Sequence, residues 1–344
     1  MNKLLEGITF YEIYPNSFCD SNNDGYGDFK GIISKLDYVQ SLGVKGIWLN
    51  PHYDSPFKDG GYDVKDFYKC SPRFGSEEDF DEMVNEIHKR GMILIVDLVA
   101  GHSSEECEMF IKSAEPYENE YSDLYVWNNN PWNTPSGMKF QNGRYQRNGC
   151  FLINFFVTQP AFNYGFYKVD DPTWQMSYKD PRTFKARDLM VNICKYWLSR
   201  GVDGFRVDGA KHVYNYGDWG GKELYEGSDD LGALNFNKNL EFFNKLHTDL
   251  VAYDSDCFMT LEVLDYSSDT IAYYLEQGVD SCFDFAMRGN IVGSVNNGTG
   301  SNLAGVYSNE LINFNAKNGN NLNSLILSNH DINRVMSDVG SDDK

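Results

Sequence analysis

Charged side chains directly follow several short apolar runs in this sequence. Asp208 lies two residues after Arg206 at the end of one run, and Glu262 and Asp331 follow two later runs. Hydrolysis of a glycosidic bond needs two carboxyl groups, because one attacks or stabilises the anomeric carbon while the other, kept protonated, gives its proton to the leaving oxygen. Arg206 would orient the Asp208 carboxylate and keep it ionised, since both side chains leave the same face of a strand. The acids therefore predict glycoside hydrolysis.

Each of these residues has a simpler interpretation when it is taken alone. An isolated aspartate at a strand end is more often a helix N-cap or a loop hydrogen-bond partner. The segment 203–212 differs, because it places Arg206, Asp208, Lys211 and His212 together directly after an apolar run. We therefore take this segment as the centre of the predicted site.

The elements that must position these residues alternate between two patterns. Apolar, β-branched runs favour strands, and the segments between them have the amphipathic spacing of helices. Gly43, Gly91, Gly201 and Gly278 each follow a predicted helix, where a left-handed residue would end it. The alternation indicates parallel βαβ units, in a (β/α) barrel or a doubly wound sheet. Strands are predicted at 10–14, 46–50, 92–99, 202–207, 258–263, 281–285 and 325–328, and helices at 31–42, 77–90, 184–200, 234–252 and 268–277.

A barrel would bring the polar residues at the strand ends together. Asp97 and His102 follow the third predicted strand, and Asn329, His330 and Asp331 follow the last. The carboxyl ends of barrel strands converge on one face, and catalytic groups gather there. The sequence therefore predicts one pocket lined by acids, an arginine and histidines.

Residues 103–182 interrupt the alternation. The segment is polar and aromatic, and it is far longer than the about 2–6 residues of an ordinary strand-to-helix loop. It predicts a small subdomain inserted after the third strand, so that residues 1–102 and 183–344 form the main α/β domain. Residues 288–302, rich in Gly, Asn and Ser, predict a long mobile loop.

The composition excludes several classes of protein. The chain is 41% hydrophobic and 23% charged, which rules out general disorder and supports a large core. A net charge of −20 would repel phosphate backbones and anionic lipid, so neither nucleic acid nor a membrane surface is an expected partner. No signal-peptide pattern precedes the first strand. Seven scattered cysteines predict reduced, buried thiols, as in a cytoplasmic protein or a secreted one whose leader has been removed.

Oxygen-bearing side chains recur at every second position near the N-terminus. Asp20, Asn22, Asp24, Tyr26 and Asp28 occupy positions 1, 3, 5, 7 and 9 of a loop with glycine at position 6, as in calcium loops. Position 12 is glycine rather than glutamate, so the loop is not an EF-hand. Hard oxygen ligands suit calcium better than zinc. The alternative is an acidic turn without a metal.

Several motifs in this chain resemble those of the α-amylase superfamily of glycoside hydrolases. The segment 204–212 is similar to the nucleophile motif of that family, and the motifs follow the family's order over nearly the whole chain. The resemblance implies a catalytic domain of the (β/α)8 TIM-barrel type, with 103–182 as a domain B-like insertion. The matching segments are 46–51, 61–64, 97–102, 159–163, 204–212 and 328–331.

The resemblance also implies roles for individual residues. Asp208 would be the nucleophile, Glu262 the general acid/base and Asp331 the transition-state stabiliser. The mechanism would be retaining, through a covalent glycosyl-enzyme, with the first two carboxyl groups roughly 5–5.5 Å apart. Tyr62 would stack on the sugar at the cleavage subsite, with Asp97 as support. Arg206, His102 and His330 would bind that sugar, Lys211 and His212 would touch the leaving-group side, and Asp63 and Arg334 would pair at the pocket floor.

Two further implications concern metal and linkage. Relatives bind a structural, stabilising calcium in a loop like residues 20–28, which favours Ca2+ there over a plain turn. Gly101 stands where the family has an asparagine that ligates another calcium between barrel and insertion, and glycine cannot do so. Gly209 stands where Ala, Val or Thr is common, at a position from which linkage preference is partly read.

The resemblance predicts more chain than this sequence contains. The sequence stops at Lys344, soon after the seventh predicted strand, whereas the family pattern continues with an eighth strand, a helix and a β-sandwich domain. We therefore expect an incomplete barrel with exposed strand edges. The chain would be a fragment, or another chain would fill the gap, or activity would have been lost.

Three functions are compatible with these motifs. The leading hypothesis is retaining hydrolysis of α-1,4-glucosidic bonds in starch-like or malto-oligosaccharide substrates, since Lys211 and His212 resemble the α-1,4-acting amylases. An oligo-1,6-glucosidase or a transglycosylase of the same superfamily is the first alternative. A truncated, non-catalytic glucan-binding protein is the second. The expected partner is an α-glucan, and the oligomeric state is left open.

Overall fold

The computed structural model describes residues 7–135, 138–142, 144–166, 169–213, 231–265, 267–276, 278–300, 302–318 and 323–340. Only the backbone is described at residues 231–240, 317 and 318. Residues 1–6 and the predicted helix end at Gln277 lie outside these ranges. Within them, no helix combines the length and the apolar character needed to cross a bilayer.

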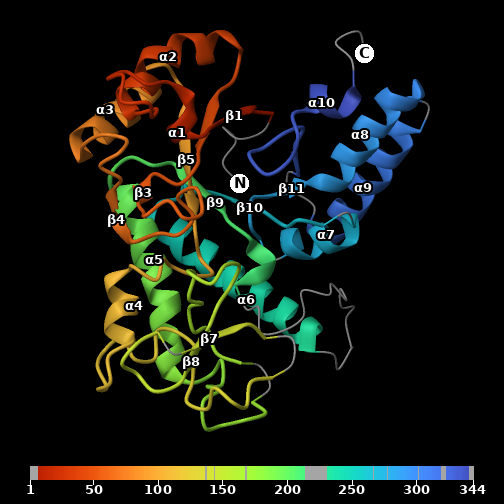
Figure 1. Cartoon of the computed structure of the whole chain (residues 1–344). Coiled ribbons are helices and arrows are strands. Elements are labelled where there is room, and N and C mark those ends of the chain that lie inside the picture. Colours follow the sequence, from red (N-terminus) through yellow and green to blue (C-terminus); the bar gives the residue numbers. More distant parts are fainter. Residues whose placement is uncertain are drawn as a thin grey trace.

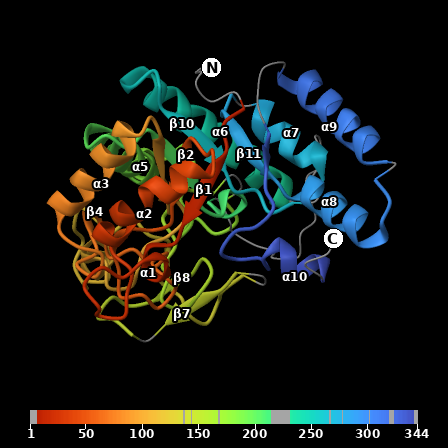
Figure 2. The ribbon, with the colours of Figure 1, turned by 90° about the horizontal axis from the view of Figure 1, so that it is seen from above.

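One curved parallel sheet forms the centre of the described chain (Figures 1 and 2). Every pairing between neighbouring strands is parallel, so helices must connect them outside the sheet. This arrangement confirms the prediction of an incomplete (β/α)8 barrel. The strand order is β1 (Phe10–Ile13), β2 (Gly46–Leu49), β5 (Ile93–Leu98), β9 (Gly204–Val207), β10 (Phe258–Leu261), β11 (Ser281–Asp284) and β12 (Ser324–Leu325).

The helices between the strands agree with the predicted ones to within a few residues. Gly43, Gly91, Gly201 and Gly278 follow them with left-handed φ between 67° and 88°, as predicted. The connecting helices are α2 (Phe29–Ser41), α3 (Glu77–Lys89), α5 (Phe184–Ser199), α6 (Leu231–Tyr253) and α7 (Ser268–Glu276). Shorter elements are α1 (Pro15–Phe18), β3 (Tyr53–Asp54), β4 (Asp66–Cys70), η2 (Pro181–Thr183), η3 (Ala210–His212) and α10 (Val335–Val339).

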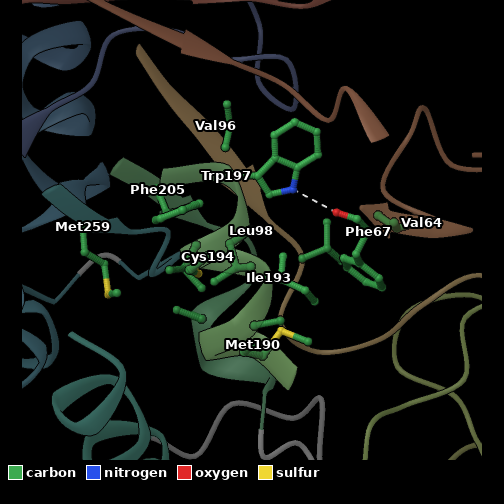
Figure 3. Packing of buried hydrophobic residues seen from close by; sticks show 14 of the residues in the cluster. Val64, Phe67, Val96, Leu98, Met190, Ile193, Cys194, Trp197, Phe205 and Met259 are labelled. Atoms are coloured by element: carbon green, nitrogen blue, oxygen red, sulfur yellow. Dashed lines mark hydrogen bonds between the residues drawn. The ribbon is translucent and has the colours of Figure 1, made fainter. Parts of the chain in front are cut away.

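The main core lies between the sheet and the surrounding helices. Figure 3 shows α5 against the sheet, where Cys194 lies near Leu98 and Phe205, all three of them buried. Trp197 of the same helix is fully buried, and its Nε1 donates to a backbone carbonyl at 2.9 Å, so its one polar atom is satisfied. All seven cysteines are free and six are buried, as the composition predicts. A second apolar cluster comprises Trp48, Ile95, Phe258, Phe283, Phe285 and Ile326.

The segment predicted as an insertion carries its own small sheet after β5. It contains α4 (Glu108–Ser113) and an antiparallel sheet of β6 (Trp127–Asn128), β8 (Cys150–Leu152) and β7 (Phe140–Asn142) in that order. Phe110 of α4 packs against Trp127 and Phe151, at ring-centroid distances of 5.8 and 4.8 Å. The division of the chain at residues 103–182 stays a prediction.

The prediction of a mobile loop at residues 288–302 is wrong for most of that segment. Residues Phe285–Asn297 form helix α8, and α9 (Leu303–Asn318) packs beside it and against α7. Asp284 begins α8, since its carboxylate accepts a hydrogen bond from Met287 N at 2.8 Å. Phe285 and Met287 are buried. The cap at Asp284, the buried first turn, the left-handed Gly298 at the other end and the packing against α9 therefore favour this helix, although Gly, Asn and Ser have low helix propensity.

Candidate active site

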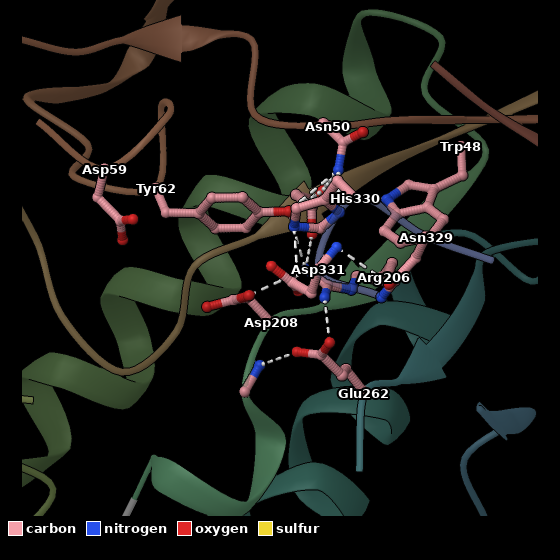
Figure 4. Close-up of polar contacts among 12 residues, drawn as sticks. Trp48, Asn50, Asp59, Tyr62, Arg206, Asp208, Glu262, Asn329, His330 and Asp331 are labelled. Atoms are coloured by element: carbon pink, nitrogen blue, oxygen red, sulfur yellow. Dashed lines mark hydrogen bonds and ion pairs between the residues drawn. The ribbon is translucent and has the colours of Figure 1, made fainter. Parts of the chain in front are cut away.

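Neighbouring strands place the predicted acids on one face of the sheet. Asp97 of β5 pairs in register with Arg206 of β9. Asp208 and Glu262 continue β9 and β10, because their amides donate at 3.0 Å to Leu98 O and Val207 O respectively. Side chains alternate along a strand, so residues two apart share a face. The four side chains therefore meet at the carboxyl ends of the strands (Figure 4).

Arg206 is the centre of this cluster and is fully buried. Its Nη1 lies 2.9 Å from Asp208 Oδ1 and also contacts Asp97 Oδ1, and its Nη2 lies 2.8 Å from Glu262 Oε1. Burial alone would lower the pKa of Arg206, but the surrounding carboxylates, Asp97 first, raise it well above its ordinary value. The guanidinium therefore stays charged and holds three acids in fixed positions.

Asp97, which the resemblance implies to be a supporting residue, contacts several groups of the cluster. Its carboxylate is fully buried, and Oδ2 accepts hydrogen bonds from Trp48 Nε1 at 3.0 Å and from the Tyr62 hydroxyl at 3.2 Å. Burial raises the pKa of Asp97, while Arg206 lowers it. Asp97 is therefore held entirely by protein groups, and its supporting role stays a prediction.

Asp208 and Glu262 each keep a narrow exposed edge, 15% and 12% of their side chains. The Gly209 amide donates to Glu262 Oε2 at 3.0 Å, which ties the two strand ends together. Arg206 favours the ionised form of Asp208, as expected, but it does not act alone. Burial has the largest effect and raises the pKa of Asp208 above its ordinary value of 3.8 against the lowering by Arg206, and the charges of Glu262 and Asp97 add to the rise.

His330 and Asp331 reach the same site from the turn after β12. Asn329 Oδ1 accepts hydrogen bonds from two following amides, including that of Asp331 at 3.1 Å, and so fixes the turn. His330 Nε2 lies 3.2 Å from Asp331 Oδ2, and the Asp331 side chain is 59% exposed. The His330 ring stacks on Tyr62 at 5.2 Å, so one face of that tyrosine is already covered. The structure thus brings Asp331 to the rim of the cluster.

Asp63 and Arg334, predicted to pair, do not do so in the described part of the chain. Asp63 is buried and accepts hydrogen bonds at 3.0 Å from the amides of Lys58 and Asp59. Arg334 is exposed and begins α10. Asp63 therefore shapes the loop that carries Tyr62.

His102 is buried, with both ring nitrogens beside protein atoms. Nε2 lies 3.2 Å from Tyr62 O, and Nδ1 lies 3.3 Å from Asn154 Nδ2. Burial lowers the pKa of His102 to about 3, so the ring is neutral. A Cβ at Gly101 would lie 2.3 Å from Asn154 Nδ2. Glycine there makes room for the amide that holds His102, which is a physical reason for its departure from the family pattern.

Lys211 and His212 follow Asp208 in η3, at the edge of the cluster. Lys211 Nζ lies 2.8 Å from the buried Asp265, which follows β10, so the two loops are joined. Burial lowers the pKa of His212 to about 4, and its ring packs on Phe155 at 5.1 Å. Their contacts with a leaving group stay a prediction.

Side chains of the predicted calcium loop accept hydrogen bonds from backbone amides within and next to the loop. Asp20 accepts hydrogen bonds from three backbone amides, the shortest being Asn23 N at 2.7 Å. Asp24 accepts one from Tyr26 N at 2.8 Å, and Asp28 caps α2 through Gly31 N. Among the described residues no three His, Cys, Asp or Glu side chains converge as metal ligands. The oxygen types still suit calcium, and the ion stays a prediction.

Sequence reasoning missed several residues of the site. Trp48 and Asn50 lie within the second-strand motif, and both side chains donate to Asp97 Oδ2. They are two residues apart and so share one face of the sheet, and the alternation of side chains along neighbouring strands could have indicated that Asp97 lies on the same face. Asp59 stands beside Tyr62 in Figure 4, and its Oδ2 accepts from Gln159 Nε2 at 2.6 Å. Since Gln159 begins the insertion motif, that motif secures the Tyr62 loop. Only the fold brings these segments together.

The fold and the site define a class of protein, an incomplete (β/α)8 barrel with a carboxylate cluster at the carboxyl ends of its strands. Residues 12–344 match the model of the alpha amylase catalytic domain, and the chain belongs to this family of glycoside hydrolases.

Among curated relatives, the chain is 31% identical over 332 residues to alpha-amylase 3 of Dictyoglomus thermophilum, covering 96% of this chain and 58% of that protein. It is 40% identical over 209 residues to the oligo-1,6-glucosidase of Bacillus cereus, covering 58% of this chain and 34% of that protein. The crystal structure of the alpha-amylase from H. orenii matches with a TM-score of 0.77 and 31% identity, over 97% of this chain and 64% of that one. The chain therefore spans less than two thirds of the length of these relatives.

Proposed function

We propose that this chain is the catalytic part of a retaining hydrolase acting on α-1,4-glucosidic bonds of starch-like or malto-oligosaccharide substrates. The observation that carries the proposal is the Arg206 guanidinium, paired with Asp208 at 2.9 Å and Glu262 at 2.8 Å while both acids keep an exposed edge. This arrangement offers two carboxyl groups to one ligand from adjacent strands.

The proposed reaction proceeds in two steps. Asp208 attacks the anomeric carbon, while Glu262 protonates the leaving oxygen and the glycosidic bond breaks. Glu262 then takes a proton from water, which attacks the same carbon and releases Asp208. Arg206 keeps its charge throughout and steadies the Asp208 carboxylate in both steps.

A second candidate is an oligo-1,6-glucosidase or a transglycosylase. It is favoured by the 40% identity to the Bacillus cereus oligo-1,6-glucosidase, which extends over 209 residues, or 58% of this chain. Linkage preference would then depend on the loops around the cluster rather than on the acids themselves.

The test is hydrolysis of maltoheptaose and of isomaltotriose by the purified chain, with Asp208→Asn as the control. Release of sugars from maltoheptaose by the wild type alone supports the proposal. Release from isomaltotriose alone supports the second candidate, and longer products than the substrate indicate transglycosylation. A folded wild type that binds maltoheptaose without cleaving it would be a glucan-binding protein.

A further inference from the structure

A carboxylate outside the acid cluster reaches the site from the first strand. Glu12 lies in β1, and its Oε1 is 2.8 Å from His330 Nδ1. The two residues are 318 positions apart, and they come from opposite edges of the sheet, since β1 and β12 are its outermost described strands. Both side chains are largely buried, with 15% of Glu12 and 17% of His330 exposed.

Strand alternation explains why Glu12 faces the site. Phe10 and Glu12 share one face of β1, and Phe10 packs against the second apolar cluster, where its ring stacks on that of Phe258 at 5.6 Å. Glu12 pairs in register with Trp48, whose indole donates to Asp97. Glu12 therefore lies at the level of the acid cluster rather than on the helix-covered side of the sheet.

The two nitrogens of His330 face two different carboxylates. Nδ1 is 2.8 Å from Glu12 Oε1, and Nε2 is 3.2 Å from Asp331 Oδ2. A neutral imidazole has one N–H and can donate to only one of them, whereas an imidazolium donates to both. Asn50 Nδ2 also lies 3.1 Å from Nδ1, but it donates to the Tyr62 hydroxyl at 3.0 Å, and Glu12 Oε1 is the nearer partner of Nδ1 at 2.8 Å. The two carboxylate contacts are therefore matched to the charged ring.

Other groups around His330 modify this preference without reversing it. Burial lowers the pKa of His330, but the hydrogen bond to Glu12 and the charges of Asp331 and Asp97 outweigh burial and the repulsion by Arg206, so the pKa is raised. The groups that face the ring are Glu12 from β1, Trp48 from β2, Asn50 after β2, Asp97 from β5, Arg206 from β9, Tyr14, Tyr62 and Asp331.

We propose that Glu12 is a positioning residue that holds His330 as an imidazolium, with Nδ1–H directed at Glu12 and Nε2–H directed at Asp331 and the substrate. This inference rests on the proposed function, because it assigns His330 to the sugar subsite of an α-glucan hydrolase. A charged donor beside Asp331 would hold that carboxylate and a sugar hydroxyl in place while the bond breaks. Loss of the proton would leave the ring with a single N–H, so that it could donate to only one of the two carboxylates.

The charge and the shape of Glu12 can be separated by Glu12→Gln, which keeps an acceptor oxygen but removes the negative charge. Glu82→Gln is the matched control, since Glu82 lies on α3 and pairs with Lys30 at the surface. The first measurement is the titration of His330 by NMR of 15N-histidine-labelled protein, assigned with His330→Gln. The expected midpoint falls by about one pH unit in Glu12→Gln and not in Glu82→Gln.

The second measurement is the pH dependence of kcat/KM on maltoheptaose. The alkaline limb should move to lower pH in Glu12→Gln, in step with the His330 midpoint, while the control follows the wild type. An unchanged His330 midpoint, or a shifted midpoint with an unmoved alkaline limb, overturns the inference.

The wild type alone provides a test that needs no folded variant. Its imidazole 15N shifts should show two N–H groups on His330 at about pH 6, below the expected midpoint. A single N–H there overturns the inference. Absence of α-glucan hydrolysis by the wild type refutes the proposed function instead, and the NMR result distinguishes the two failures.

Discussion

The backbone amide of Gly209 donates to Glu262 Oε2 at 3.0 Å, so the residue after Asp208 holds the second acid. Gly209 adopts a left-handed conformation with φ of 47°, and a Cβ there would lie 3.0 Å from Phe155 Cζ. The turn that follows Asp208 is thus also the turn that orients Glu262. Most side chains would disturb both the conformation and the contact.

Gly209→Ala should lower the free energy of unfolding by about 1–2 kcal/mol, because an L residue is strained in this conformation. It should also lower kcat/KM, since the amide moves away from Glu262. The control is Gly289→Ala within α8, where nothing lies within 4 Å of the added Cβ. That change should raise stability by about 0.5–1 kcal/mol. Urea denaturation of both variants checks the prediction, and a similar response of the two would contradict it.

Asp208→Asn should lower kcat by roughly a thousandfold or more, because the amide cannot form the glycosyl-enzyme. Maltoheptaose should still bind, since Arg206 and the aromatic residues of the site are unchanged. Initial rates and calorimetric titration measure the two effects. Retained hydrolysis would show that another residue is the nucleophile.

Arg206→Gln should lower the free energy of unfolding by about 3–5 kcal/mol, because it leaves buried carboxylates without a cation. This loss of unfolding free energy should be smaller at acid pH, because the carboxyl groups become protonated there and no longer need a counter-charge. Arg90→Gln is the control, since Arg90 pairs with Asp37 and Glu86 near the surface. Denaturation curves at two pH values compare them, and equal losses would contradict the central role of Arg206.

His88 contributes stability that depends on pH. A hydrogen bond to Asp203 raises the pKa of His88 above its ordinary value of 6.5, against the effect of partial burial. A raised pKa in the folded state means that this stabilisation is present below the unfolded pKa and is lost as pH rises through the folded one. His88→Gln should therefore lower the melting temperature more at about pH 5.5 than at about pH 8.5. An equal fall in melting temperature at the two pH values would contradict a pH-dependent contribution of His88.

Calcium should raise the melting temperature of the wild type, because an ion that binds only the folded chain stabilises it. Asp24→Ala should abolish that gain, since it removes a predicted ligand. Asp28→Ala offers a contrast, because Asp28 also caps α2 and its loss should destabilise the chain with or without calcium. Melting curves of the three proteins, recorded with added calcium and with a chelator, measure these effects. Identical wild-type curves under the two conditions would show that the loop is a turn that binds no calcium.

The sequence by itself predicted the seven strands of the main sheet, the five helices from α2 to α7 that connect them and the residues most suited to chemistry, but it missed α8 and α9. Apolar runs, the amphipathic spacing and the glycines after helices are local signals. The strands and connecting helices appear close to where these signals place them, except that β12 is Ser324–Leu325 rather than 325–328. The motif around Arg206 and Asp208 was equally local, because strand alternation already puts the two side chains on one face.

Only the tertiary structure decided which distant side chains meet. The contacts of Glu12 with His330 and of Asp59 with Gln159 depend on how the sheet curves and where the insertion lies. The net effect on the Asp208 pKa depends on burial and on several neighbours at once, whereas the sequence showed only the nearby arginine. Helix α8 formed against its residue propensities because of burial and capping. Local patterns specify elements, but charge, burial and long-range contacts are properties of the assembled fold.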